Sequence, residues 1–205
     1  MVEPHFDDLL PSLKTGDIIL FSGKGGFSRS IKWFTVTRWS HVGMVLRLPE
    51  FSDPLIWESL RIPEIPDVID GEMKSGVQLL NLVDRVKTCT AEIAIRTLNF
   101  PITEEMFESL ITFRDTVRNR PYEKSILELV RAAWDGPFGR NEENLDSIFC
   151  SELIAEAYQA MGLLQCDTKG GAPSNEYTPK YFAEEGNLAL QGKWTLGPAK
   201  LVKRA

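Results

Sequence analysis

Short apolar runs separated by polar loops that contain glycine or proline dominate the first half of the sequence. Bounded apolar runs of this kind are typical of strands, and the run at 91–98 also alternates apolar and polar residues with a period of two. We therefore predict strands over 17–21, 40–48, 55–58, 77–82, 91–98 and 196–202. The strand at 55–58 is the expected antiparallel partner of the strand at 40–48.

Apolar residues in the second half recur at helical spacing instead. Thr103 is a predicted N-cap for a helix over 103–118, where Ile102 and Phe107 can form a hydrophobic staple and two glutamates complement the helix dipole. A second helix is predicted over 125–134, followed by a polar loop over 135–146. Proline at the first position of a helix is pre-organised, so the Thr178-Pro179 pair predicts a short helical turn.

Strands gathered in the first half and helices in the second indicate the α+β class. We find no internal repeat and no linker, and 205 residues suit one domain. The prediction is a single domain over 1–205 in which a small antiparallel sheet or half-barrel packs against helices.

Charge and cysteine content narrow the classes of function. A net charge of −6 argues against general binding to nucleic acid. Neither a signal-peptide pattern nor an apolar run long enough to span a membrane is present, so we expect a soluble, cytoplasmic protein. Three widely spaced cysteines favour neither a disulfide framework nor a metal site. The glycine-rich stretch at 22–26 lacks the spacing of a phosphate loop, and no cofactor is expected.

The segment 27–39 mixes aromatic and basic residues. One interpretation is a short helix that packs on the core with its basic residues in solvent. The other is a rim that contacts substrate or, weakly, a membrane surface, and on that interpretation Trp39 is a candidate substrate contact.

The stretch 146–162, DSIFCSELIAEAYQAMG, carries the strongest chemical signal. Apolar residues recur at helical spacing behind Cys150, and Gly162 is the predicted stop. The sequence therefore predicts a thiol at a helix N-terminus, where the dipole favours a thiolate and unpaired N–H groups can hold an oxyanion. The alternative is that Cys150 is a small core residue.

A nucleophilic thiol needs a base and a group that orients that base. His41 begins an apolar strand, where an imidazole is unusual unless it is used or hydrogen-bonded, and histidine titrates near neutral pH. Glu58 ends the predicted neighbouring strand, and cross-strand neighbours lie about 5 Å apart at Cβ. His41 and Glu58 are thus candidate partners of Cys150, whereas the alternatives are a structural histidine and an exposed strand-end acid.

Several motifs together are familiar: LKTGDIILF, GGFSRSIKW, WSHVGMV, LIWES, FCSELIAEAY and YTPKYF. In this order they resemble the circularly permuted branch of the NlpC-type papain-like cysteine hydrolases. The nearest likeness is to YiiX/YebB-like members, and a more distant one is to lecithin retinol acyltransferase-like proteins. The acyltransferase-like proteins tend to have a second histidine at the position of Glu58, and this chain departs from them there.

The resemblance implies a permuted papain-like fold in which Cys150 is the nucleophile, His41 the general base and Glu58 the orienting residue. Chain order does not matter to such a triad, because only its geometry does. Tyr122, in RPYEK, occupies a position where such proteins often place an aromatic residue near the cleft, so it is a second candidate substrate contact.

Three hypotheses for function follow. The first is a cysteine hydrolase that forms a thioester from a peptide, amide or acyl-ester substrate. The second is a lipid acyltransferase or phospholipase at membrane surfaces. The third is a non-catalytic binding module on the same fold. The sequence does not indicate an oligomeric state.

Overall fold

The computed structural model describes residues 3–23, 38–118, 142–166 and 169–203, and over 142–148 it describes the backbone alone. The predicted helix over 125–134 and the segment 27–37 therefore lie outside the described residues.

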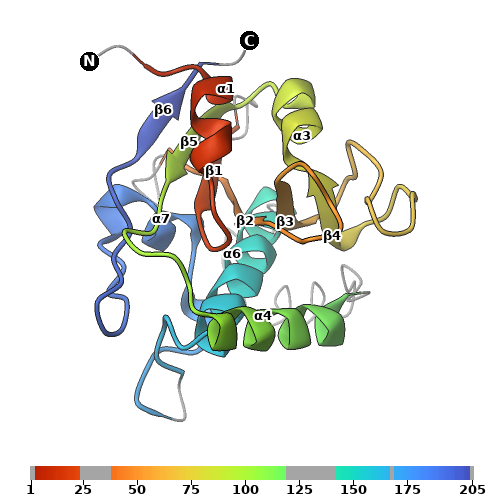
Figure 1. Cartoon of the computed structure of the whole chain (residues 1–205). Helices are drawn as coiled ribbons and strands as arrows, with labels where there is room; N and C mark the ends of the chain where they lie inside the picture. Colours follow the sequence, from red (N-terminus) through yellow and green to blue (C-terminus); the bar gives the residue numbers. More distant parts are fainter. Residues whose placement is uncertain (1–2, 24–37, 119–141, 167–168, 204–205) are drawn as a thin grey trace.

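One antiparallel sheet organises the described part of the chain (Figure 1). Its strand order is β4-β3-β2-β1-β5-β6, and every neighbouring pair is antiparallel. The predicted pairing of the strand at 55–58 with the strand at 40–48 is confirmed, since Met44 lies opposite Trp57. The strands are β1 Ile18–Ser22, β2 His41–Leu46, β3 Leu55–Leu60, β4 Gly76–Asn81, β5 Glu92–Arg96 and β6 Lys200–Val202.

Helices cover both faces of this sheet. In Figure 1, α6 lies behind β2 and β3 and contacts both, α4 packs against α6, and α1 lies in front of β1. The helices are α1 Phe6–Leu9, α3 Leu82–Thr88, α4 Glu104–Val117, α6 Glu142–Ala160 and α7 Pro179–Phe182, with 3₁₀ turns at Leu10–Ser12, Ser174–Glu176 and Glu184–Gly186. The prediction of an antiparallel sheet packed against helices is confirmed. None of the described helices is long and apolar enough to cross a membrane.

The side chains of β1 alternate between the two faces of the sheet, and all of them are buried because both faces are covered. Ile18 and Leu20 join the apolar cluster that includes residues of α4 and α6. Ile19 and Phe21 join a second cluster with residues of α1 and α3. The sheet therefore separates two cores, which explains why β1 is a continuous apolar run.

Two predicted helix boundaries hold. Thr103 caps α4, where its hydroxyl oxygen accepts a hydrogen bond from the backbone N–H of Met106 at 3.3 Å. Gly162 follows α6 with a φ of +74°, a conformation that glycine adopts without strain.

The predicted start of the helix that carries Cys150 is wrong. Helix α6 begins at Glu142, so Cys150 lies inside it and not at its N-terminus, and residues 142–146 are helical where a polar loop was predicted. The segment 142–149 contains no glycine or proline that would stop a helix. Because a helical N–H bonds to the carbonyl four residues earlier, the Cys150 N–H is used within the helix. The helix terminus therefore neither favours a thiolate at Cys150 nor makes its N–H an oxyanion donor.

Arg96, the last residue of β5, is buried and binds the C-terminal segment. Its guanidinium donates four hydrogen bonds of 2.7–3.0 Å to backbone carbonyls. The acceptors are Phe182, Ala183, Leu196 and Gly197. The register places Arg96 beside Ile18, whereas His41 lies beside Phe21 near the other end of β1.

Candidate active site

Strands β2 and β3 hold His41 and Glu58 on the same face of the sheet. His41 is the first residue of β2, and continuing the β2–β3 register places Gly43 opposite Glu58. A Cβ at Gly43 would lie 2.7 Å from Cδ1 of Ile56 and 3.4 Å from Cβ of Glu58. Only glycine fits this crowded position, and its lack of a side chain allows the Glu58 carboxylate to reach His41. The distance from His41 Nε2 to Glu58 Oε2 is 2.5 Å.

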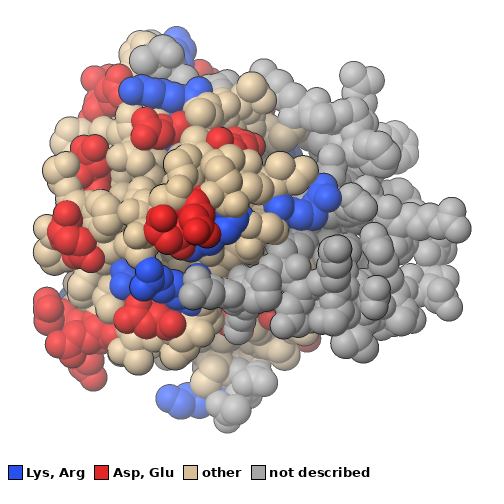
Figure 2. All heavy atoms as spheres, turned by 90° about the vertical axis from the view of Figure 1, so that its right-hand side faces the viewer, with Lys and Arg blue, Asp and Glu red and all other residues tan. Residues whose placement is uncertain are grey.

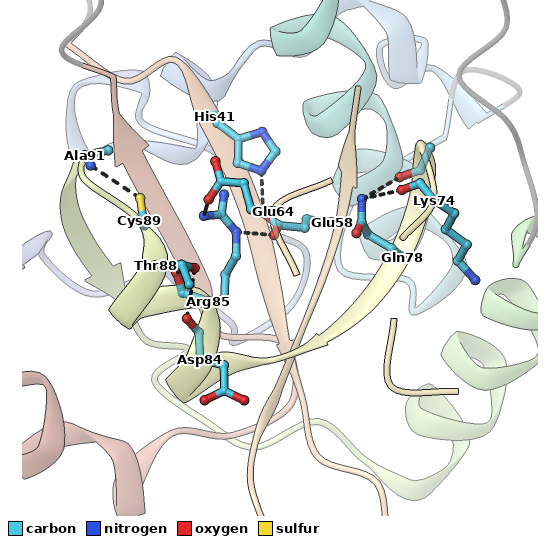
Figure 3. Close-up of polar contacts among 11 residues, drawn as sticks. His41, Glu58, Glu64, Lys74, Gln78, Asp84, Arg85, Thr88, Cys89 and Ala91 are labelled. Atoms are coloured by element: carbon cyan, nitrogen blue, oxygen red, sulfur yellow. Dashed lines mark hydrogen bonds and ion pairs between the residues drawn. The ribbon is translucent and has the colours of Figure 1, made fainter. Parts of the chain in front are cut away.

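A third side chain, Arg85, contacts the other oxygen of the same carboxylate (Figure 3). Arg85 comes from α3, and its Nε lies 2.6 Å from Glu58 Oε1. Its Nη1 donates to Glu64 at 2.9 Å, and its guanidinium lies 4.7 Å from the ring centre of Phe21. The ring of Phe21 lies 5.4 Å from that of His41. These contacts link His41, Glu58 and Arg85 in one cluster.

The charges around Glu58 keep it ionised although it is fully buried. Burial by itself raises the pKa of a carboxyl group, because it disfavours the charged form. Arg85 and then His41 outweigh this effect through their charges and hydrogen bonds, and the pKa of Glu58 lies below its usual value. The same carboxylate raises the pKa of Arg85, against the effect of burial.

Cys150 contacts His41 from helix α6, which packs against the sheet. The thiol is fully buried on α6, which packs on β2 and β3. Burial lowers the pKa of His41, but the charges of Cys150 and Glu58, and hydrogen bonds to both, raise it to about 10. The arrangement therefore favours a protonated imidazole beside the ionised Glu58 carboxylate.

The structure thus brings together three predicted residues that come from β2, β3 and α6. Trp39 is buried in the same apolar cluster as Cys150, and the Arg38 guanidinium lies 4.8 Å from its ring centre. Tyr122 lies outside the described residues. The roles of all five residues remain predictions.

The YTPKYF motif is hydrogen-bonded to α6 at Ser151, the residue after Cys150. The hydroxyl of Ser151 donates to the carbonyl of Tyr177 at 2.6 Å, and both residues are buried. The predicted turn at Pro179 is the short helix α7. This motif therefore contacts the helix that carries the thiol.

Comparisons with known proteins find similarity among solved structures. No protein-family model matches the chain, and no curated protein matches it. Among solved structures it is similar to the metalloprotein yiiX (DUF1105) from Escherichia coli O157:H7, at 18% sequence identity and a TM-score of 0.47. The match covers 72% of this chain and 65% of that chain, less than two thirds of the neighbour's length. The permuted papain-like arrangement stays a prediction.

Sequence reasoning missed Arg85 and Glu64. The signal for α3 was present: Asn81 precedes LVDRVKT, and its side chain accepts hydrogen bonds from the N–H groups of Val83 and Asp84. An asparagine cap before helix-forming residues predicts a helix start. Nothing local identifies Glu64, which lies in the loop between β3 and β4, because its partner is distant in sequence.

Opposite charges lie close together on the face at the right of Figure 1, as Figure 2 shows. On the loop between β3 and β4, Lys74 pairs with Asp67 at 3.1 Å and with Asp70 at 2.5 Å. A small hollow opens between this loop, β4 and the end of α4, and none of the triad candidates lines it. Within the described residues, no group of three His, Cys, Asp or Glu side chains could hold a metal ion.

Proposed function

We propose that this protein is a cysteine hydrolase that cleaves an amide, peptide or acyl-ester bond with Cys150, His41 and Glu58. The observation that carries the proposal is the position of His41 between Glu58, whose Oε2 lies 2.5 Å from Nε2, and the Cys150 thiol, which contacts the same ring. An ion pair of thiolate and imidazolium is the activated form of a nucleophilic cysteine.

In the first half of the reaction, the Cys150 sulfur attacks the substrate carbonyl carbon. A carbon–sulfur bond forms and the carbonyl electron pair moves to oxygen. When this intermediate collapses, the bond to the leaving amine or alcohol breaks, and His41 gives that group its proton. Because Nε2 of His41 faces Glu58, Nδ1 is the nitrogen left to serve the thiol and the leaving group.

In the second half, water attacks the thioester. His41, now neutral, takes a proton from the water as the oxygen–carbon bond forms. The carbon–sulfur bond then breaks, releasing the acid and restoring the thiolate beside a protonated His41. Glu58 stays ionised throughout and holds the ring orientation, as the acid of a catalytic triad does.

Residue-by-residue alkylation tests the proposal directly. A small iodoacetamide-type reagent is applied at several pH values to the native protein and to His41→Ala, and each cysteine is quantified by mass spectrometry. We expect Cys150 to react below the pH of about 8.5 at which a free thiol ionises, and to slow at least about tenfold without His41. Cys89, which is buried as Cys150 is, reports alkylation that occurs through opening of the fold, and the half-buried Cys166 reports an accessible thiol, so Cys150 is compared with both.

Two outcomes contradict the proposal. Equal alkylation rates at Cys150 in the native protein and in His41→Ala would show that no activating pair exists and would favour the binding module. Alkylation without turnover of ester and amide substrates, together with co-sedimentation with lipid vesicles, would favour the lipid-acting alternative.

A further inference from the structure

The Glu58 carboxylate is shared between two cations. Oxygen Oε2 lies 2.5 Å from His41 Nε2, and oxygen Oε1 lies 2.6 Å from Arg85 Nε. Each oxygen therefore has its own charged donor, and both bonds lie in the buried part of the protein, where charge-assisted hydrogen bonds are strong. A carboxylate held at both oxygens has little freedom to rotate away from the imidazole.

Arg85 is itself fixed from three directions. Helix α3 begins with the Asn81 cap, four residues before Arg85. The Arg85 guanidinium stacks over Phe21, and its Nη1 bonds to Glu64. Only 4% of the Arg85 side chain is exposed, compared with 45% of the Glu64 side chain. The planar fork of arginine serves both glutamates at once, a geometry that the single ammonium of lysine does not reproduce.

We propose that Arg85 is a positioning residue for the active site. Through Glu58 it sets the orientation and the charge of His41, and Glu64 keeps the Arg85 guanidinium in place. The resulting series of side chains, Glu64, Arg85, Glu58 and His41, alternates in charge and ends at Cys150. The importance of this series for turnover rests on the proposed function, but its effect on the His41 ring does not.

The loss of Arg85 has a definite physical consequence. Glu58 would then be a buried carboxylate with a single cationic partner, and burial would raise its pKa. A protonated Glu58 no longer stabilises an imidazolium, so the pKa of His41 would fall from about 10. A merely structural arginine would leave the titration of His41 unchanged.

NMR titration of the histidine rings tests this without any substrate. The chain has two histidines, and the exposed His5 serves as an internal reference in every spectrum. In Arg85→Met we expect the titration midpoint of His41 to move down by at least about one pH unit while that of His5 stays in place. Arg85→Lys keeps the charge and loses the fork, so it should move the midpoint by a smaller amount.

Arg96→Lys is the matched control, because Arg96 is also a buried arginine, but it lies on β5 and bonds to backbone carbonyls near the other end of β1. It should leave the His41 midpoint unchanged. If Arg85→Met does not fold, Arg85→Lys and Glu64→Gln decide the question. An unchanged His41 midpoint in the folded Arg85 variants, or an equal shift in Arg96→Lys, would overturn the proposal.

The alkylation profile of Cys150 separates this proposal from the proposed function. If Arg85→Lys shifts both the His41 midpoint and the pH profile of Cys150 alkylation, the arginine acts on the nucleophile through Glu58 and His41. If the His41 midpoint shifts although the native protein hydrolyses no substrate, the positioning role stands and the hydrolase proposal fails.

Discussion

Two buried arginines, Arg85 on α3 and Arg96 at the end of β5, have opposite kinds of partner. Arg85 bonds to the carboxylates of Glu58 and Glu64, whose charges raise its pKa against burial. Arg96 bonds to four backbone carbonyls, and burial lowers its pKa. The carbonyl dipoles satisfy the hydrogen bonds of Arg96, and the charges of Glu184 and Glu185 only partly offset its burial. The carboxylates that contact Arg85 satisfy its hydrogen bonds and also balance its charge.

The contrast between these partners indicates a different role for the region around each arginine. The Arg96 region ties the C-terminal segment to the end of β5, and a change there should act on stability. The Arg85 region contains an ionised acid, an imidazole and a thiol in contact, and a change there should act on reactivity and on pH dependence. The following predictions test this division.

The largest effect is expected at the thiol. Cys150→Ala should reduce hydrolysis at least about 10³-fold, because no other group can form the thioester. The midpoint of urea unfolding should also fall, because Cys150 supplies part of the rise in the pKa of the buried His41 ring. Steady-state assays and urea titrations of the same preparation measure both. Residual turnover above one tenth of the native rate would exclude Cys150 as the nucleophile.

At Arg96, the expected loss is in stability. Arg96→Met should lower the free energy of unfolding by about 3 kcal/mol, because it leaves buried carbonyls without donors. Urea denaturation measures this loss. The rate of Cys150 alkylation in the folded variant should match that of the native protein, and a slower rate would show that the two regions are not independent.

Replacing Glu58 should affect both reactivity and stability. Glu58→Gln keeps the shape but removes the charge between His41 and Arg85, so about 3 kcal/mol of stability should be lost, as when one partner of a buried ion pair is removed. The His41 midpoint in NMR should fall. Glu105→Gln, on the exposed side of α4, is a matched control that should change neither quantity.

The pH dependence of stability should show the raised pKa of His41. Its pKa rises from 6.5 to about 10 on folding, so folded His41 holds a proton that unfolded His41 has lost. This contribution to stability is complete below pH 6.5 and disappears as the pH rises toward about 10. Urea titrations measure it as the difference between native His41 and His41→Gln.

Both proteins in that comparison should carry Cys150→Ser, so that no thiol titrates at the site. Because Cys150 supplies part of the rise, the loss should then be complete at a lower pH than in the native protein. A difference between the two proteins that does not change with pH would contradict the charge arrangement around His41.

The smallest predicted effect is the loss of stability when either of two helix caps is removed. Asn81→Ala and Thr103→Ala should each cost about 1 kcal/mol of unfolding free energy. Only the cap of α3 supports Arg85, so only Asn81→Ala should also shift the His41 midpoint in NMR. Equal effects of the two variants on His41 would show that α3 does not position the site.

The sequence by itself determined the strands, because their apolar runs are bounded by turn residues and their periodicity is local. It also determined the α4 cap at Thr103 and the end of α6 at Gly162, where the chemistry of one or two residues decides the backbone. It singled out His41, Glu58 and Cys150 as candidates, since an imidazole and a carboxylate on apolar strands and a thiol in an apolar helical segment are unusual.

The contacts among these residues depend on the tertiary structure and could not be predicted from local sequence. The start of α6 was predicted too late, because no glycine or proline between Glu142 and Cys150 marks where the helix begins. Arg85 and Glu64 become part of the site through contacts 27 and 21 residues apart in sequence. Burial of Arg85 and Glu58 strengthens the interaction of their charges, and burial is a property of the folded sheet and helices together.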